Sequence, residues 1–477
     1  MANRGNFSGR IGFILAAAGS AVGLGNIWRF PYLAGENGGA IFLLVYLGCI
    51  FFLCYPVMVG EIAIGRAANS DAYGSYNKLG GKKWGYLGLF GIIAGILILS
   101  FYNVVAGWAF GYFLHISFGN LLNQQDFGGF FGAFVNDILD VSSAHGLANS
   151  NLIFSLFFMV FTAIIVSQGI QKGIEASNKI MMPSLYLILL GIIVYSLTLP
   201  NAFSGVKFYL VPDFSELKIQ TVVDGLKQAF FSLSLGMGAL ITYGSYLSKK
   251  ENITSSAAVI SIADTSVAFF SGLMVFPLVH FLAFKLNINP TEIGTSGPPL
   301  IFVVLPQIFH EMGPILGRII GGSFFLLVCF AALTSTISLL EVPVAYLVDQ
   351  KKYNRKGVVW AMALIIFVCG LPSMVSQGMM PALNKLSFYR GQDFLTFISD
   401  MSDICLTVGG CLMSIFISRR WGIHNMDAEL ANGNDNYMTS RVRKFLHITL
   451  KWIAPILLGF LSIVIILEKF FGIENLI

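Results

Sequence analysis

Charged residues are scarce in this chain of 477 amino acids. Asp, Glu, Lys and Arg together make up 11% of the residues, whereas 56% are hydrophobic. A typical soluble domain has about 25% charged residues. Many apolar runs here reach about 20 residues, enough to cross the hydrocarbon core of a bilayer. The composition excludes a soluble globular protein and predicts an all-α membrane protein that crosses the bilayer many times.

Cysteine and histidine are also few, with six of each. The cysteines all lie in apolar segments, so we expect small buried side chains and no disulfide framework or metal site. They are Cys49, Cys54, Cys329, Cys369, Cys405 and Cys411. His310-Glu311 lacks the second histidine of a zinc-protease motif, and no glycine-lysine phosphate-binding loop is present. An enzyme is therefore not expected.

Eleven membrane-spanning helices are predicted, all in a single transmembrane domain over residues 1–477. The expected ranges are 11–36, 40–68, 85–118, 150–168, 176–199, 221–247, 253–284, 316–347, 357–376, 394–418 and 446–470. The first carries Asn26 and Arg29 and lacks a small-residue cleavage site, which indicates a retained span and not a signal peptide. An odd number of spans places the two termini on opposite faces of the membrane.

Lysine and arginine concentrate at the N-terminus and in alternate connections, around residues 66–83, 172–179, 249–250, 351–356 and 419–444. The positive-inside rule makes these segments cytoplasmic and places the C-terminus outside. The connection 119–149 holds three aspartates and no Lys or Arg, which fits the outer face. The loop 285–315, also outside, contains the apolar run 298–306, too short to span. We expect it to dip back as an outer plug, with a surface helix as the alternative.

Two predicted spans are interrupted by glycine and serine, at residues 19–26 and 231–238. In lipid an unpaired peptide group costs several kcal/mol, so such breaks are tolerated only inside protein or along a polar cavity. Breaks at matching places predict an inverted repeat of five plus five helices, 11–199 and 221–418, with 446–470 as an extra helix. Helices 1 and 6 would then be discontinuous. The alternative is that Gly19-x-x-x-Gly23 is only a helix-packing motif.

Polar side chains in mid-span point to the same region. Asp264 is the strongest signal, because an ionisable residue at membrane depth indicates a functional site. The alternative for Asp264 is a protonated carboxyl that serves only packing. The adjacent hydroxyls of Thr334 and Ser335, with carbonyls freed at a break, would form the weakly charged oxygen shell that suits Na⁺. Tyr102, Ser232 and Ser234 add further polar groups.

Four stretches of the sequence resemble one known family. Residues 21–32 read Ala-Val-Gly-Leu-Gly-Asn-Ile-Trp-Arg-Phe-Pro-Tyr and 36–39 read Glu-Asn-Gly-Gly; residues 230–236 read Phe-Phe-Ser-Leu-Ser-Leu-Gly, and 331–335 read Ala-Ala-Leu-Thr-Ser. With them the chain resembles the neurotransmitter:sodium symporters over nearly its whole length, and in particular the bacterial sodium-coupled amino-acid transporters. The resemblance implies sodium-coupled import of an amino acid by alternating access.

The resemblance also implies two sodium sites. The first would consist of the Ala21 carbonyl, Asn26, Ser232, Asp264 and the substrate carboxylate. The second would consist of the carbonyls of Gly19, Val22 and Ala331 with the hydroxyls of Thr334 and Ser335.

The substrate site implied by the resemblance comprises Ser20, Ala21, Gly23, Leu24, Gly25, Ile98, Tyr102, Phe231, Ser232, Ser234, Met237, Ser335 and Leu339. The carboxylate would meet the Leu24 and Gly25 amides and the Tyr102 hydroxyl. Gly23 stands where carriers of amines without a carboxyl group have an aspartate, which favours an intact amino acid. The adaptable thioether of Met237 favours a hydrophobic or aromatic L-amino acid.

Chloride dependence and gating follow from the same resemblance. Asp264 stands where many relatives have asparagine, and Ala268 stands where chloride-dependent members have serine. We expect the Asp264 carboxylate to replace bound chloride and transport to be chloride-independent. The outer gate would comprise Arg29 and Asp400 bridged by Gln228, with Asp403 as the alternative acid and with Tyr102 and Phe231 as the lid. The inner gate would comprise Arg4, Asp349 and Tyr246.

The expected partners are the amino acid, two Na⁺ and the lipid bilayer, without nucleic acid or an obligatory protein partner. The chain lacks the long cytoplasmic tails, the extracellular cysteine pair and the twelfth helix of the animal transporters, which favours a bacterial inner membrane. Proton coupling through Asp264 is the alternative within transport. An amino-acid-gated channel or sensor is the alternative outside it. The preferred amino acid, the ion stoichiometry and the oligomeric state stay open.

Overall fold

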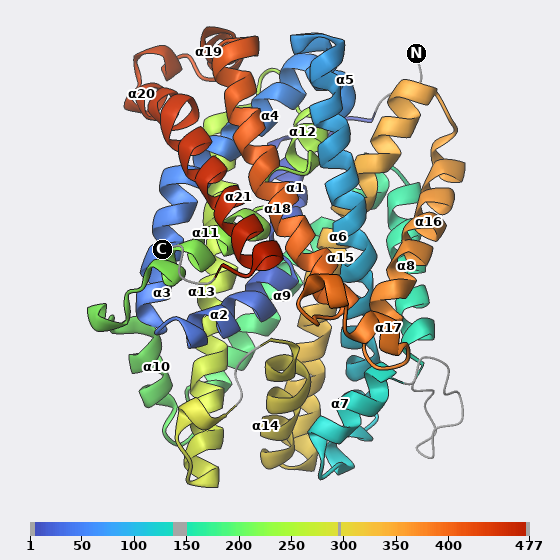
Figure 1. Ribbon diagram of the computed structural model, residues 1–477, viewed down its shortest axis with the longest axis vertical. Coiled ribbons are helices and arrows are strands. Elements are labelled where there is room, and N and C mark those ends of the chain that lie inside the picture. Colours follow the sequence, from blue (N-terminus) through green and yellow to red (C-terminus); the bar gives the residue numbers. More distant parts are fainter. Residues whose placement is uncertain (1–4, 137–149, 294–296, 474–477) are drawn as a thin grey trace.

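The computed structural model describes residues 5–136, 150–293 and 297–473, and this part of the chain is a bundle of helices (Figure 1). Eight of its helices are long and apolar enough to cross a membrane. The bent pair Arg10–Ala21 and Gly25–Glu36 makes a ninth span if it is counted as one. The chain is therefore an all-helical polytopic membrane protein with a broken helix near its N-terminus.

The helices of the predicted spans are as follows: α1 (Arg10–Ala21), α2 (Phe30–Glu36), α3 (Ala40–Cys49), α4 (Tyr55–Ala68), α6 (Lys82–Ser117), α8 (Asn151–Ser167), α9 (Ala176–Ser196), α11 (Ile219–Ser232), α12 (Ala239–Gly244), α13 (Ile253–Leu286), α15 (Pro314–Lys351), α16 (Arg355–Val375), α18 (Phe394–Ile415) and α21 (Ala454–Phe471). Two predicted spans are not among the long apolar helices. One is α8, which has 17 residues, and the other is the sixth, which is split into α11 and α12.

Shorter helices mark the two ends of the bundle. The lower end in Figure 1, called here the α14 end, carries α7 (Phe127–Asn136), α10 (Ala202–Leu210) and α14 (Leu305–Glu311). The upper end, called the α5 end, carries α5 (Ala72–Gly80), α19 (Ile423–Ala431) and α20 (Arg441–Ile448). The segment 300–311 packs its apolar side chains against the bundle, where the Phe302 ring contacts Trp108 and Tyr112. It folds back onto the protein, as expected for the loop 285–315.

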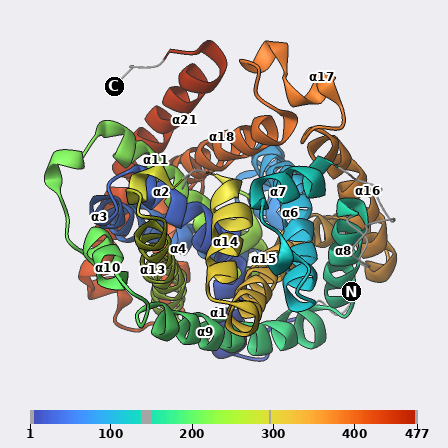
Figure 2. The ribbon, with the colours of Figure 1, turned by 90° about the horizontal axis from the view of Figure 1, so that it is seen from below.

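Burial separates a centre from a perimeter. In the most apolar stretches of α13 and α15, 78% of the residues are buried. In those of the spans that contain α9 and α21, 39% of the residues are buried. Figure 2 shows α8, α9, α16 and α21 around the outside of the bundle. Cys369 on α16 is exposed for this reason, and Cys49 and Cys411 are half-buried, which corrects the expectation that all the cysteines are buried. The broken first span lies inside, because α1 packs against α9, α13 and α15.

The first break follows α1 directly. Val22 adopts an extended conformation, and the chain turns by 50° before it continues as a helix. The amides freed by the break find partners inside the protein: the Gly23 amide donates to Asn26 Oδ1 at 3.0 Å, and the Leu24 amide donates to the Tyr102 hydroxyl at 2.8 Å. Side chains therefore satisfy the peptide groups that lipid could not.

The second break lies between α11 and α12. Ser234, Gly236 and Gly238 all have positive φ angles, of 55°, 84° and 76°. A side chain at Gly236 would place its Cβ 2.2 Å from the Leu406 carbonyl oxygen, so only glycine fits there. The freed Gly236 amide donates to Glu61 Oε1 at 2.7 Å. This break is thus held by a carboxylate from α4 and by the backbone of α18.

Candidate functional site

A central cavity lies between the two breaks. Its lining comprises Ser20, Ala21, Gly23, Gly25, Ile98, Tyr102, Phe231, Ser232, Ser234, Met237, Ser335, Leu339 and Leu406. The fold thus brings together residues from both breaks with side chains of α6, α15 and α18. All but Leu406 were expected at the substrate site from the sequence. Leu24, the remaining expected residue, instead lines a second cavity towards the α14 end.

A buried polar cluster around Asp264 borders the central cavity through Ser232. Asn26 Nδ2 donates to Ser232 Oγ at 2.9 Å and to Asp264 Oδ1 at 2.8 Å. Ser232 Oγ lies 2.9 Å from both carboxylate oxygens of Asp264, and the Tyr46 hydroxyl lies 3.3 Å from Oδ2. Asn26 and Asp264 are fully buried. The three side chains expected at the first sodium site therefore lie in mutual contact, and their oxygens carry one formal negative charge.

A second group of oxygens lies where α15 meets the first break. Thr334 Oγ1 lies 3.2 Å from the Val22 carbonyl oxygen and 2.9 Å from that of Ala331. Ser335 Oγ lies 3.3 Å from the same Val22 oxygen. Gly19 is also close, since a Cβ on it would lie 3.4 Å from Thr334 Cβ. The residues expected at the second sodium site thus lie together, and their ligand atoms are all neutral.

Tyr102 and Gly23 determine the shape of the cavity near the first break. The Leu24 amide donates to the Tyr102 hydroxyl, so this amide and this hydroxyl lie side by side. A Cβ on Gly23 would lie 2.5 Å from Ser335 Oγ and 2.6 Å from the Tyr102 oxygen. Residue 23 therefore has no room for a side chain in this structure. Ser234 Oγ donates to the Ser20 carbonyl at 2.9 Å and joins the two breaks directly.

Three residues at the site were not singled out from the sequence. Nothing in the sequence distinguishes Leu406, because it is an ordinary apolar residue in an apolar span. Tyr46 resembles any other aromatic residue of the run 40–68. Glu61 could have been found from the sequence, because it is an ionisable residue in the same apolar run. In the structure its Oε2 has no hydrogen-bond partner among the described residues.

Arg29 lies on the side of the central cavity that faces the α14 end, where it lines the second cavity. Its Nη1 lies 3.0 Å from Asp403 Oδ1 and its Nη2 lies 2.5 Å from Asp403 Oδ2, while its guanidinium carbon lies 4.8 Å from the centre of the Phe231 ring. The partner of Arg29 is thus Asp403, the alternative acid, in place of Asp400. Tyr102, Phe231 and Gly25 line both the central cavity and the second cavity beyond it, and so lie between the two.

Asp400 makes other contacts. It accepts from the Tyr389 hydroxyl at 2.6 Å and lies 3.7 Å from Lys469 Nζ. Gln228 donates from Nε2 to the Gly25 carbonyl at 2.7 Å, which differs from the expected bridge between Arg29 and a carboxylate. Gln228 instead ties α11 to the first break.

At the α5 end the expected gate residues are only partly described. Arg4 lies outside the described residues. Asp349 accepts from the Asp71 amide at 3.0 Å, and the Tyr246 hydroxyl donates to Glu341 Oε1 at 2.9 Å. Arg355 pairs with the same fully buried Glu341. Tyr246, Glu341 and Arg355 thus join the segment that follows α12 to α15 and α16.

Comparison with known proteins identifies the family. The model of the sodium:neurotransmitter symporter family matches residues 4–128 and 123–472. The chain belongs to this family. It is a sodium-dependent transporter and not an enzyme. The resemblance given by the motifs around residues 21–39, 230–236 and 331–335 is thereby confirmed.

Relatives of this sodium:neurotransmitter symporter span bacteria and archaea. The uncharacterized sodium-dependent transporter YhdH of Bacillus subtilis is 36% identical over 434 residues, which cover 90% of this chain and 91% of that protein. The corresponding transporter MJ1319 of Methanocaldococcus jannaschii is 35% identical over 372 residues, 76% of this chain and 74% of that protein. The crystal structure of MhsT in complex with L-phenylalanine matches with a TM-score of 0.84 and 41% identity, covering 97% of this chain and 99% of that one.

Proposed function

We propose that this chain is a sodium-coupled symporter that imports a neutral hydrophobic or aromatic L-amino acid by alternating access. The observation that carries this proposal is the central cavity, which is enclosed by both helix breaks and has the Asn26, Ser232 and Asp264 cluster on one side. A membrane transporter whose central cavity lies between two helix breaks and next to a buried carboxylate can hold a zwitterion and a cation together.

The chemistry of the lining supports the substrate class. The Leu24 amide and the Tyr102 hydroxyl would receive the substrate carboxylate, and carbonyls of the breaks would receive its ammonium group. Ile98, Met237, Leu339 and Leu406 form an apolar part of the lining, which suits a hydrophobic side chain. A similar preference is supported by MhsT, whose structure holds L-phenylalanine.

Two Na⁺ would bind at the two oxygen groups described above. The substrate carboxylate would complete the first group, so the binding of substrate and of Na⁺ would strengthen each other reciprocally. Each Na⁺ moving inward gains about 2.3 kcal/mol per 100 mV of membrane potential. The charge of Asp264 also supports chloride independence, because a unit charge about 5 Å from Na⁺ contributes about 3 kcal/mol at an effective dielectric constant of 20.

We place the chain in a bacterial inner membrane with its N-terminus in the cytoplasm and its C-terminus outside. The α5 end would then be cytoplasmic and the α14 end external. The positive residues of the connections near α5, α19 and α20 support this orientation. The halves 11–199 and 221–418 would form the inverted repeat, and each half contains one broken helix.

Proteoliposome uptake tests the function directly. The purified chain is reconstituted, and uptake of each of the twenty amino acids is measured under an inward Na⁺ gradient, a choline control and a proton gradient at fixed Na⁺. We expect Na⁺-driven accumulation of large apolar amino acids that persists when gluconate replaces chloride. Accumulation driven by protons in choline would favour proton coupling instead, and currents far larger than solute flux would favour a channel.

A further inference from the structure

Arg29 selects one of two acids that lie one helical turn apart. Asp400 and Asp403 are both on α18, and both Asp400 and Arg29 line the cavity towards the α14 end. Asp400 is close enough to interact electrostatically with Arg29. Even so, Arg29 forms its two parallel hydrogen bonds with Asp403 alone of these two acids. Other contacts of Asp400 must therefore explain why it does not bond to Arg29.

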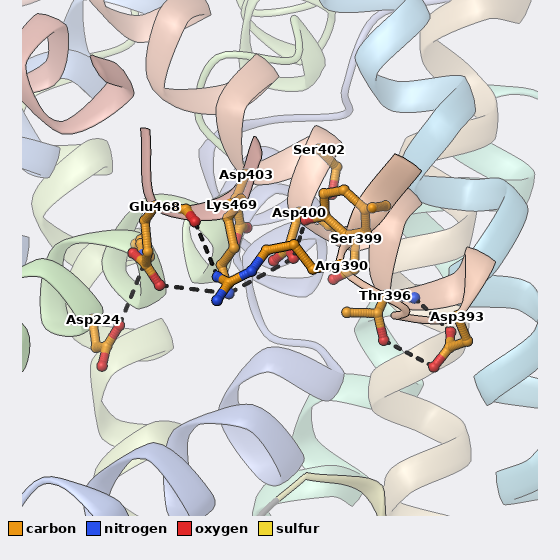
Figure 3. Close-up of polar contacts among 12 residues, drawn as sticks. Asp224, Arg390, Asp393, Thr396, Ser399, Asp400, Ser402, Asp403, Glu468 and Lys469 are labelled. Atoms are coloured by element: carbon orange, nitrogen blue, oxygen red, sulfur yellow. Dashed lines mark hydrogen bonds and ion pairs between the residues drawn. The ribbon is translucent and has the colours of Figure 1, made fainter. Parts of the chain in front are cut away.

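Figure 3 shows what holds Asp400: its carboxylate faces Lys469, a residue near the end of α21. Asp400 Oδ2 lies 3.7 Å from Lys469 Nζ and 2.6 Å from the Tyr389 hydroxyl. Tyr389 is buried and its ring packs against those of Phe397 and Phe470. Burial and the hydrogen bond to Asp400 raise the pKa of Tyr389 well above its usual value. The hydroxyl therefore stays protonated and donates a hydrogen bond to Asp400.

Lys469 is itself fixed by a chain of charges. Its Nζ lies 3.7 Å from Glu468 Oε1, and Glu468 Oε2 lies 3.4 Å from the nearly buried Lys227 of α11. Lys227 in turn lies 3.6 Å from Asp224. Arg390 donates to the Glu468 carbonyl at 3.3 Å. The end of α21 thus connects α11, half of the broken sixth span, with α18, which carries both acids.

We propose that Lys469, together with Tyr389, is a positioning residue that withholds Asp400 from Arg29 and so makes Asp403 the acid of the gate. Selection against a near-equivalent partner is a general source of specificity, because two equal partners would give two closed geometries. The eleventh helix would then have a defined part in gating, although it lies outside both predicted half-repeats. The inference rests on the proposed transport function.

A double-mutant cycle in proteoliposomes tests the assignment. Asp403→Asn alone should lower kcat/KM for uptake by about 30-fold, because it leaves Arg29 without its partner. In a Lys469→Met background Asp400 is released and can replace Asp403, so the same Asp403→Asn change should cost only about threefold. Asp400→Asn should cost less than about threefold in the wild type but about 30-fold in the Lys469→Met, Asp403→Asn protein.

Two further variants separate positioning from simple support of the fold. Lys469→Arg keeps the charge and should restore the wild-type pattern, whereas Tyr389→Phe removes the second donor and should weaken the selection of Asp403 in the same direction as Lys469→Met. Lys285→Met is the matched control, because Lys285 pairs with Glu311 at the same end of the molecule and away from Asp400. It should leave the cost of Asp403→Asn unchanged.

The outcomes distinguish this inference from the function on which it rests. Wild-type protein without Na⁺-driven uptake would overturn the proposed function and the gate with it. Wild-type uptake combined with an equal cost of Asp403→Asn in the wild-type and Lys469→Met backgrounds would overturn the inference alone. If Lys469→Met does not fold, the same cycle is measured with Tyr389→Phe in its place. An equal cost of Asp403→Asn in the wild-type and Tyr389→Phe backgrounds would then overturn the inference.

Discussion

The two proposed sodium sites share the first helix break but differ in charge. The first includes the carboxylate of Asp264, which is fully buried and bonded to Asn26 and Ser232. The second has only hydroxyls and carbonyls, with the Val22 oxygen shared by Thr334 and Ser335. Charge should therefore dominate the first site, and the positions of neutral oxygens should dominate the second.

This difference also separates the roles of the two sites. The first borders the central cavity through Ala21 and Ser232, so an ion bound there would touch the carboxylate of the proposed substrate. The second joins α15 to the first break, so its ion would hold that break in place. Coupling to substrate would thus reside in the first site, and ordering of the broken helix would reside in the second.

Removing the charge should have the largest effect. Asp264→Asn keeps the shape of the side chain but loses about 3 kcal/mol of attraction for Na⁺, so the Na⁺ concentration for half-maximal uptake should rise about 100-fold. Because chloride could then supply the missing charge, uptake by this variant should be stimulated by chloride. Wild-type uptake should not change when gluconate replaces chloride.

The Asp264→Asn measurement is uptake against Na⁺ concentration with and without chloride. Asp213→Asn serves as the control, since Asp213 lies in the connection before α11 and bonds only to Ser215 among the contacts of the described residues. Unchanged Na⁺ dependence of Asp264→Asn would remove the charge difference on which the comparison of the two sites is based.

Removing one neutral ligand should have an intermediate effect. Thr334→Val preserves the size of the side chain but deletes the hydroxyl, which should raise the half-maximal Na⁺ concentration about tenfold. Chloride should not rescue this variant, because no charge has been lost. Thr336→Val is a matched control on the same helix, since the Thr336 hydroxyl bonds to Thr162 and Leu333 and not to the first break. Equal effects of the two variants would contradict the second site.

The position of the cavity was predictable from the sequence because its cause is local. Glycines and serines in apolar runs break helices, and lipid forces each break into the protein interior. Gly236 shows this directly, since the Leu406 carbonyl leaves no space for a Cβ. The family motifs then supplied the proposed ligand sets around Ala21, Ser232 and Thr334.

The partner of Arg29 could not be settled in the same way. Asp400 and Asp403 have nearly the same surroundings in sequence, and the contacts that distinguish them come from Tyr389 and Lys469. Lys469 lies on a helix outside the half-repeats, so no local pattern connects it with Asp400. Leu406 escaped prediction for a similar reason, because only tertiary packing brings one apolar side chain of α18 to the cavity.

The smallest effect should come from a residue that lines the cavity but belongs to neither sodium site. Met237→Leu keeps the apolar volume but removes the flexible thioether, so the ratio of kcat/KM for phenylalanine to that for leucine should fall about threefold. The Na⁺ dependence should stay the same, because neither group of oxygens changes. Uptake competition between the two amino acids at several Na⁺ concentrations measures both quantities. A shift in Na⁺ dependence as large as that of Thr334→Val would show that the cavity wall and the ion sites are not separable. The distinction between a charged site linked to the substrate and a neutral site that orders the broken helix would then be wrong.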